Sequence, residues 1–255
     1  MSTKCKKIHR ILIWLAALPV LVLILYLCMG AFAPMPSAPD NSLDKPVGEN
    51  YALFSEMLVM PYETASVSDW NLALVNPSNT IAQDYKITLT QLKDGQSIDE
   101  RCYPDLQEMM DACRAEGLLP IICSSYRTSE DQQKLFDNKV NSLIAIGYPQ
   151  ETAKAEAAKT VAIPGTSEHQ LGLALDIVDQ NNQNLDETQE DTPVQQWLME
   201  NSWKYGFILR YPESKSDITG IIYEPWHYRY VGRDTAQYMY ENDICLEEYL
   251  ELVKG

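Results

Sequence analysis

The sequence predicts an α+β domain with a small central antiparallel sheet flanked by helices, preceded by one N-terminal transmembrane helix. Apolar residues with helical spacing are concentrated in the first half of the folded region, and short strand-like segments in the second half. A run of 22 residues without charge, residues 11–32, lies near the N-terminus. The chain of 255 residues is long enough for one substantial domain and an anchor.

The N-terminal segment is expected to anchor the chain in a membrane. Residues 11–32 can span the hydrocarbon core as a helix. Residues 1–10 form a basic head, and no Lys or Arg follows the apolar run until Lys45. This asymmetry places the head in the cytoplasm and the remaining chain on the outer face of the membrane. A cleaved signal peptide is the alternative, but Pro34 and the length of the run favour an uncleaved anchor.

Residues 33–50 are expected to form a stalk, because they combine four prolines with polar residues. The extracytoplasmic domain would then span residues 51–255. Apolar spacing and capping residues predict helices at 104–116, from Ser129 as the N-cap, at 150–159, from Thr192 to about 205, and after Asp234. Alternation and apolar runs predict strands at 72–75, 87–92, 118–123, 172–178, 207–211 and 226–231.

The charge balance limits the possible partners. The chain has 20 basic and 36 acidic residues, and removing the four basic residues of the head leaves a net charge near −20 outside the membrane. A nucleic-acid-binding protein must neutralise phosphates, so nucleic acid is not an expected partner. The acidic excess is interpreted as a solvated surface.

Four cysteines belong to the expected outer domain, and their redox state stays open. Cys102, Cys113, Cys123 and Cys245 allow three full pairings, and none forms a CxxC zinc pattern. Buried thiols and disulfides are equally compatible with the sequence.

The first candidate site is the string Ser167-x-His169-x-x-Gly172-x-Ala174-x-Asp176. Imidazole nitrogens and carboxylate oxygens are good zinc ligands. Asp176 falls within an apolar strand, where a carboxylate is costly unless it is paired or bound to a metal. The alternative is a buried aspartate that accepts backbone hydrogen bonds, but His169, seven residues earlier, favours a metal.

The second candidate site is the string Glu224-Pro225-Trp226-His227. His227 heads a predicted strand, and Pro225 restricts Glu224 to an extended conformation. Glu224 can therefore lie close to His227 without binding the same metal. A surface glutamate beside a histidine packed among aromatic residues is the alternative interpretation.

Together these residues supply three ligands and one free carboxylate, a set that suits a catalytic zinc site. His169, Asp176 and His227 would leave the fourth zinc position for water, whose pKa falls to roughly 7 there. Glu224 could then accept the proton of the attacking water.

A third string, Ser124-Ser125-Tyr126-Arg127, offers a cation at a strand-to-helix junction. The Arg127 guanidinium could stabilise a developing oxyanion; the alternative is a surface arginine that caps or pairs locally. Gln132, on the following helix, could hold a substrate amide or carboxylate.

The strings SSYRTSEDQQKLF, PGTSEHQLGLALDIV and YEPWHYRYVG resemble the VanY-type D-alanyl-D-alanine carboxypeptidases, a zinc peptidase group that includes VanX-like dipeptidases and L,D-carboxypeptidases. The resemblance covers residues 70–233, approximately. It implies one zinc ion per chain on His169, Asp176 and His227. It also implies Glu224 as general base and acid and Arg127 as stabiliser of the tetrahedral intermediate. Substrate-pocket positions of the family match Ser167, Gln132 and Trp226.

The resemblance implies a zinc metallocarboxypeptidase, not a serine enzyme, that removes the terminal D-Ala from peptidoglycan precursor pentapeptides. With the expected anchor, the enzyme would be held on the outer face of a bacterial cell membrane. Such an activity would lower the targets of a glycopeptide antibiotic such as vancomycin. The expected partners are stem peptides ending in D-Ala, and the chain is expected to be a monomer. The alternatives are an L,D-carboxypeptidase that acts on wall tetrapeptides and a non-catalytic, zinc-containing wall-binding module. A VanX-like dipeptidase is disfavoured because its substrate is made in the cytosol.

Overall fold

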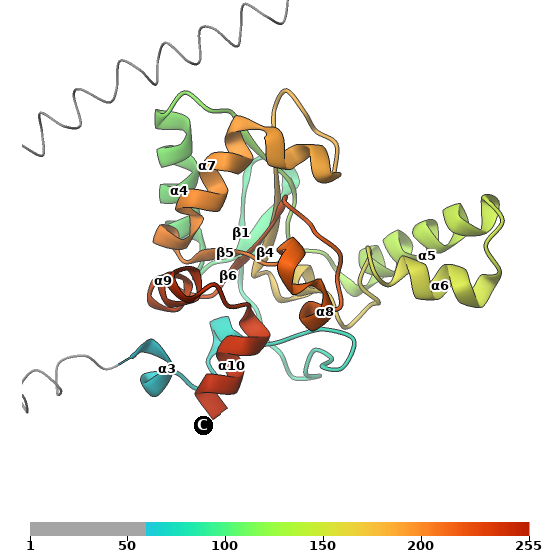
Figure 1. Cartoon of the computed structure of the whole chain (residues 1–255), viewed down its shortest axis with the longest axis horizontal. Helices are drawn as coiled ribbons and strands as arrows, with labels where there is room; N and C mark the ends of the chain where they lie inside the picture. The colour runs from blue at the N-terminus through green and yellow to red at the C-terminus, as the bar shows by residue number, and fades with distance from the viewer. Residues whose placement is uncertain (1–59, 255) are drawn as a thin grey trace, which may run out of the picture. The chain divides into compact units, whose positions relative to one another are not determined.

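The computed structural model describes residues 60–254, so the expected head, anchor and stalk (residues 1–10, 11–32 and 33–50) lie outside the described residues. Among the residues described, no helix has the length and apolar character needed to cross a membrane. The helices are α3 (Pro61–Thr64), α4 (Tyr103–Ala115), α5 (Ser129–Ala145), α6 (Gln150–Ala157), α7 (Pro193–Asn201), α8 (Ser216–Thr219), α9 (Arg233–Asn242) and α10 (Leu246–Lys254) (Figure 1).

A four-stranded antiparallel sheet forms the centre of the domain, with strands in the order β3-β4-β6-β5. Its strands are β3 (Pro120–Ser124), β4 (Ala174–Asp179), β6 (His227–Tyr230) and β5 (Phe207–Leu209). A separate antiparallel pair joins β1 (Leu89–Gln91) to β2 (Ser97–Asp99). The expected α+β class with an antiparallel sheet is therefore confirmed.

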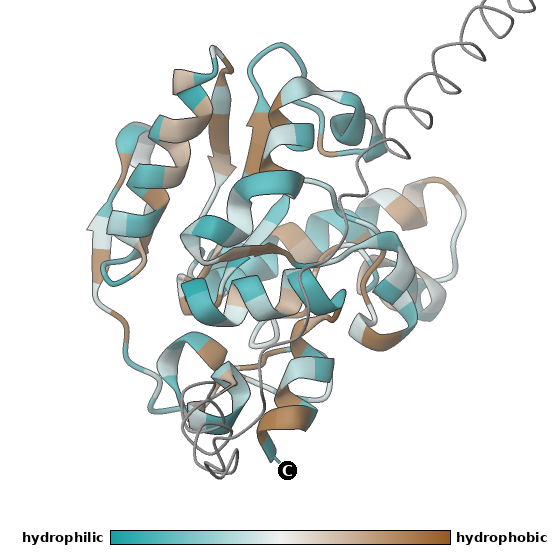
Figure 2. Cartoon of the chain, turned by 60° about the vertical axis from the view of Figure 1, so that its left-hand side comes forward, coloured by the Kyte–Doolittle hydropathy of each residue, from teal (hydrophilic) through white to brown (hydrophobic). Residues whose placement is uncertain are grey.

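One face of the sheet packs on the main hydrophobic core. Alternation along β4 directs Leu175 and Ile177 to this side, where α4 and α7 cover the strands (Figure 1). Figure 2 shows apolar residues on the strands and polar residues over much of the surrounding helices. The helices contribute buried apolar side chains at Leu106, Met109, Met110, Cys113, Val194 and Leu198. The opposite face of the sheet is thereby left for polar side chains.

Side-chain caps mark the starts of α5 and α7. Thr192 caps α7 with its side chain accepting from the backbone N–H of Gln195, and Pro193 occupies the first turn, as expected. The expected N-cap of α5 is wrong by one residue. Thr128, not Ser129, accepts the N–H of Asp131, because Thr128 has extended backbone dihedrals and Ser129 already belongs to the helix.

The predicted strand at residues 72–75 is wrong. The segment instead contains a short 3-10 turn, Trp70–Leu72, followed by an isolated bridge between Asn76 and Asn79. The carbonyl oxygens of Asn71 and Ala73 accept hydrogen bonds from the buried Arg229 guanidinium at 3.0 and 2.9 Å. Because these carbonyl groups accept hydrogen bonds from a side chain, part of the hydrogen-bonding capacity of this backbone is satisfied without a neighbouring strand.

Helices α5 and α6 form a hairpin that projects from the sheet and its covering helices (Figure 1). The hairpin has a small hydrophobic cluster of its own, made by Phe136, Val140, Ala153 and Ala157. Helices α9 and α10 contribute to another cluster, which includes Met239, Leu246 and Tyr249. Residues 60–254 thus form one main core and two satellite clusters.

The four cysteines of the described domain are free thiols. Cys102, Cys113 and Cys245 are buried, whereas Cys123 is exposed at the end of β3. Burial raises the pKa of the Cys113 and Cys245 thiols to about 11, so both are neutral near pH 7.

Gly172 is a glycine whose replacement we expect to be costly. Its φ is +68°, and an added Cβ would lie 2.2 Å from Ile87 Cδ1 and 3.2 Å from the backbone nitrogen of Asp99. Gly117 also has a positive φ, +78°, but has no atom within 4 Å of an added Cβ. Gly117→Ala should lower the free energy of unfolding by about 1 kcal/mol, and Gly172→Ala by roughly 2–4 kcal/mol. Equal losses in urea unfolding would contradict this assignment.

Candidate metal centre

The register of β4 and β6 brings the two candidate strings together. Asp176 lies directly opposite His227 in this antiparallel pair. Side chains opposite one another on the same face of a sheet have Cβ atoms about 4.5–5.5 Å apart. Both side chains project to the face away from the main core, and both are buried. His227 Nδ1 lies 3.2 Å from Asp176 Oδ1.

His169 reaches the same point from the turn that precedes β4. It belongs to the 3-10 segment Glu168–Leu171, which ends at Gly172 in the left-handed conformation. The Nδ1 atom of His169 lies 2.7 Å from the carbonyl oxygen of Ser125, which accepts its hydrogen. This bond turns Nε2 toward Asp176 Oδ2, at 3.3 Å. The outer hydrogen bond therefore selects the ring nitrogen that faces the site.

His169, Asp176 and His227 form a group that could hold one metal ion. Each offers one ligand atom, and these atoms lie within 4.8 Å of one another. Across residues 60–254, the buried side-chain atoms without a hydrogen-bond partner are Arg127 Nε, Gln132 Oε1, His169 Nε2 and Asp176 Oδ1. Buried polar atoms are usually paired, so two unpaired ligand atoms at one point fit a bound cation.

Burial and neighbouring charges disfavour protonation of His169, whereas neighbouring charges favour protonation of His227. Burial and the neighbouring Arg127 lower the pKa of His169 to about 4, despite the attraction of Asp176. Burial also disfavours a charged His227, but its close contacts with the Asp176 and Glu168 carboxylates outweigh burial and raise its pKa to about 9. Asp176 has a pKa well below its usual range, because the two histidines outweigh the effect of burial. Metal binding would displace the proton from His227 Nδ1.

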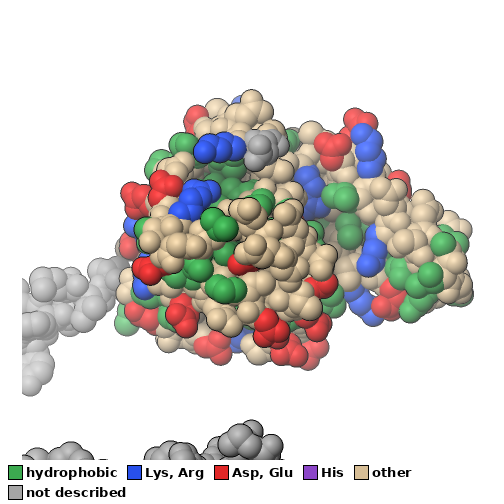
Figure 3. All heavy atoms as spheres, turned by 90° about the horizontal axis from the view of Figure 1, so that it is seen from above, with side chains coloured by type: hydrophobic (Ala, Val, Ile, Leu, Met, Phe, Trp, Pro, Cys, Tyr) green, Lys and Arg blue, Asp and Glu red, His purple; other side chains and the backbone are tan. Residues whose placement is uncertain are grey.

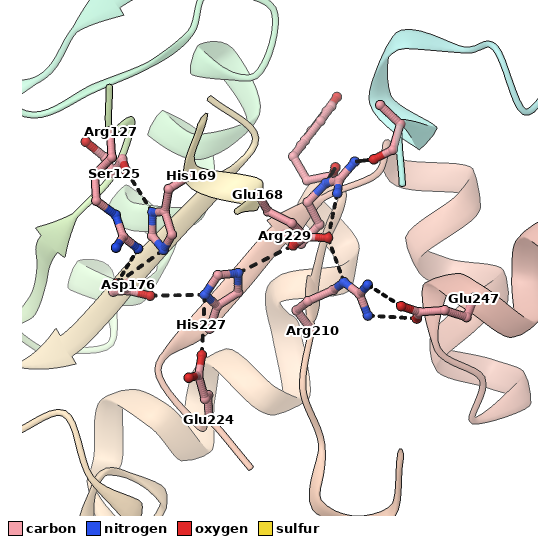
Figure 4. Close-up of polar contacts among 12 residues, drawn as sticks. Ser125, Arg127, Glu168, His169, Asp176, Arg210, Glu224, His227, Arg229 and Glu247 are labelled. Carbon is pink, nitrogen blue, oxygen red and sulfur yellow. Dashed lines mark hydrogen bonds and ion pairs between the residues drawn. The ribbon is translucent and has the colours of Figure 1, made fainter. Parts of the chain in front are cut away.

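Glu224 lies beside the metal group without belonging to it (Figure 4). Its Oε2 atom is 3.6 Å from His227 Nδ1, and its backbone nitrogen donates to the carbonyl oxygen of Tyr211. Burial raises the pKa of Glu224 to about 8, and the adjacent His227 partly opposes this rise. A carboxyl group with such a pKa can both accept and donate a proton near neutral pH.

Arg127 approaches the group from the junction of β3 and α5. Its Nη2 atom lies 3.9 Å from Asp176 Oδ2, and its backbone N–H donates to the carbonyl oxygen of His169. The side chain is 19% exposed, while its Nε atom is buried without a partner. The guanidinium thus borders the cleft with unused donor capacity.

The site lies in a cleft of about 850 Å³ that is open to solvent. Figure 3 shows the surface hollowed between the projecting α5–α6 part and the rest of the domain. The lining includes the metal group, Glu224, Arg127 and the expected pocket residues Ser167, Gln132 and Trp226. Gln132 donates from Nε2 to the carbonyl oxygen of Ala162 at 2.6 Å, which leaves its buried Oε1 without a partner. The structure therefore brings all eight sequence-predicted site residues into one cleft.

Two residues near the centre were not predicted. Glu168 Oε2 lies 3.4 Å from His227 Nε2, and the Tyr211 ring packs on the His227 ring with centroids 4.8 Å apart. Glu168 precedes His169 in the sequence, but the sequence does not indicate that its side chain points toward His227. Tyr211 ends a predicted strand with no local signal of chemistry.

Two histidines and an aspartate around one point, beside an unbound carboxylate and an arginine, are the arrangement of a metal-dependent hydrolase. Comparison with known proteins agrees with this class. Residues 95–233 match the family model of VanY, D-alanyl-D-alanine carboxypeptidase. A D-alanyl-D-alanine carboxypeptidase of Enterococcus faecalis is 50% identical over 192 residues, which cover 75% of this chain and 70% of the relative.

Solved structures give the same result. A mutant VanY D,D-pentapeptidase from a VanB-type resistance cassette, in complex with Zn(II), is 50% identical, with a TM-score of 0.66 over 71% of this chain and 99% of that one. VanYB in complex with D-alanine-D-alanine is also 50% identical, with a TM-score of 0.67 over 72% and 98%. The LdcB LD-carboxypeptidase is 38% identical, with a TM-score of 0.55 over 69% and 78%. The chain belongs to the VanY D-alanyl-D-alanine carboxypeptidase family.

Removing one member of the group tests the centre directly. Asp176→Ala should abolish stoichiometric metal binding, because two histidines alone leave a site without its anionic ligand. The bound metal per chain would be measured by elemental analysis after dialysis. Asp191→Ala is the control, because Asp191 is an exposed aspartate outside the cleft. Retention of one tightly bound metal ion by Asp176→Ala would exclude this residue as a ligand.

Proposed function

We propose that this chain is a membrane-anchored zinc D,D-carboxypeptidase that removes the terminal D-Ala from peptidoglycan precursor pentapeptides. The observation that carries the proposal is the convergence of His169, Asp176 and His227 beside Glu224. Family membership supports the reaction class. The complex of the VanYB relative with D-alanine-D-alanine supports the substrate class.

Zinc is the proposed metal, with one ion per chain. Nitrogen and carboxylate ligands suit zinc, and the VanY relative binds Zn(II). When bound, zinc supplies Lewis-acid chemistry, which lowers the pKa of a water molecule and polarises a carbonyl group.

The residues of the chain then have separate roles. Glu224 accepts the proton of the attacking water and returns it to the leaving amine of D-Ala. Arg127 donates hydrogen bonds to the oxygen that gains negative charge in the transition state. Of the pocket residues, Gln132 offers its unpaired Oε1 atom to a substrate N–H group, and Ser167 and Trp226 line the pocket beside it.

The proposed location is the outer face of a bacterial cell membrane. Residues 11–32 would anchor the chain, residues 33–50 would form the stalk, and the domain from residue 51 onward would act on stem peptides as a monomer. The uncharged run and the basic residues that precede it support this layout. Removing the terminal D-Ala would lower the number of D-Ala-D-Ala termini that a glycopeptide antibiotic can bind. The activity would therefore contribute to glycopeptide resistance.

An L,D-carboxypeptidase is the second candidate, because the LdcB structure is 38% identical to this chain. The two activities differ in the stereochemistry of the penultimate residue. Both activities use the same metal group and the same general base. The contacts of the cleft with that penultimate residue would therefore decide between them.

Glu224→Gln tests the proton-transfer role. The amide keeps the shape of the side chain but cannot accept a proton, so kcat should fall about 10²–10⁴-fold while zinc stays bound. Both quantities are measurable by D-Ala release and elemental analysis. Glu213→Gln, an exchange at an exposed glutamate outside the cleft, is the matched control. Unchanged turnover of Glu224→Gln would remove this residue from the mechanism.

Substrate choice tests the proposed specificity. The zinc-loaded protein should release D-Ala from a synthetic muramyl pentapeptide at least tenfold faster than from the corresponding tetrapeptide. Mass spectrometry of both reactions measures the ratio. Preference for the tetrapeptide would establish the L,D activity instead, and hydrolysis of neither peptide would contradict both.

A further inference from the structure

We infer that Glu247, on the C-terminal helix α10, positions the metal ligand His227 through Arg210 and Glu168. The inference rests on the metal site of the proposed function. It adds three positioning residues to that site, one of them outside the residues 95–233 that match the family model.

The inner contact of this chain of residues joins Glu168 to His227. Glu168 Oε2 lies 3.4 Å from His227 Nε2, on the side of the ring opposite Nδ1 (Figure 4). Nδ1 is the nitrogen that faces Asp176 and the metal position. A carboxylate behind a ligating imidazole fixes the orientation of the ring and the nitrogen that it presents. Glu168 therefore does for His227 what the Ser125 carbonyl does for His169.

Two buried arginines hold Glu168 in this position. Arg210 Nε and Arg229 Nη1 both donate to Glu168 Oε1 at 2.7 Å. The side chains of all three residues are fully buried. Both hydrogen bonds use Oε1, which leaves Oε2 directed at the histidine. The arginines thus determine which carboxylate oxygen meets the ring.

The two arginines differ in what holds them. Arg229 follows His227 on the same face of β6, and it is fixed by the backbone carbonyl oxygens of Asn71, Ala73 and Tyr230. Arg210 instead forms a two-bond ion pair with Glu247, with Nη1 to Oε2 at 2.9 Å and Nη2 to Oε1 at 2.7 Å. A paired fork of this kind restricts the plane and direction of a guanidinium.

The charge balance explains why Glu247 matters at this distance. Arg210 and Arg229 together carry two positive charges, whereas Glu168 carries one negative charge. An uncompensated buried charge is strongly unfavourable. Glu247, with its side chain 14% exposed, supplies the second negative charge at the outer end. Without Glu247, Arg210 loses two hydrogen bonds and its preferred direction, so Glu168 loses one of its two fixed donors.

The test measures zinc affinity of the full-length protein by competition with a chromophoric chelator. Glu168→Gln should raise the zinc dissociation constant about 10–100-fold, the range for residues that orient metal ligands. Glu247→Gln acts one contact further away, so we expect about a 10-fold rise. The absorption spectrum of the cobalt-substituted protein should also change in both variants, because the ligand field depends on the direction of the His227 ring.

Glu248→Gln is the matched control on the same turn of α10. Glu248 binds Lys215 and the backbone nitrogen of Cys245 and forms no hydrogen bond or ion pair with Arg210. Its zinc affinity should stay within twofold of the parent. If Glu247 acts through Glu168, adding Glu247→Gln to Glu168→Gln should raise the dissociation constant less than twofold further.

The outcomes separate this inference from the proposed function. Unchanged zinc affinity and cobalt spectrum in Glu247→Gln, with or without a lower melting temperature of the metal-free protein, would overturn the positioning role. Because Glu247 is partly exposed, this variant also decides the question if Glu168→Gln fails to fold. A parent that binds zinc but hydrolyses neither peptide would overturn the function, whereas the affinity differences would still support the positioning.

Discussion

Antiparallel pairing of β4 with β6 in one register is the constraint on which the site depends. It places Asp176 opposite His227 and Ala174 opposite Arg229, so ligands and a supporting arginine share one face. A slip of one residue would move every side chain of a strand to the other face of the sheet. The main hydrophobic core opposes such a slip, because Leu175 and Ile177 occupy the opposite face of β4 and are completely buried. The packing of α4 and α7 therefore maintains the chemistry on the far side.

Buried charge around the metal position is organised in two layers. In the inner layer, Asp176 Oδ1 and His169 Nε2 are unpaired ligand atoms that, with the His227 imidazole, suit a cation. In the outer layer, Glu168 is fully paired with Arg210 and Arg229, which hold its pKa well below the usual range against the effect of burial. The same residue type thus serves opposite purposes: Glu224, without a strong partner, has a raised pKa of about 8.

Site residues that belong to short sequence motifs could be predicted, whereas residues identified only by contacts with distant parts of the chain could not. His169, Asp176, Glu224 and His227 belong to short strings whose residue types and spacing indicate metal chemistry, and the fold brings these strings together. The contacts of Arg210 span 42 residues to Glu168 and 37 to Glu247, and no local pattern indicates such pairs. The wrong strand at residues 72–75 has a related cause. The apolar run at residues 72–75 favours a strand, but the distant Arg229 donates hydrogen bonds to the carbonyl oxygens of Asn71 and Ala73.

The separate cluster of the α5–α6 hairpin has a consequence for how this scaffold can diversify. The hairpin contributes Gln132, Leu135 and Lys139 to the cleft, yet Phe136 and its neighbours pack among themselves and not with the main core. Substitutions or length changes in the hairpin can therefore reshape the peptide-facing wall without disturbing the register of β4 and β6. Selection can alter which cell-wall peptide is accepted while the reaction machinery stays intact, so recognition and catalysis can evolve on largely independent parts of the domain.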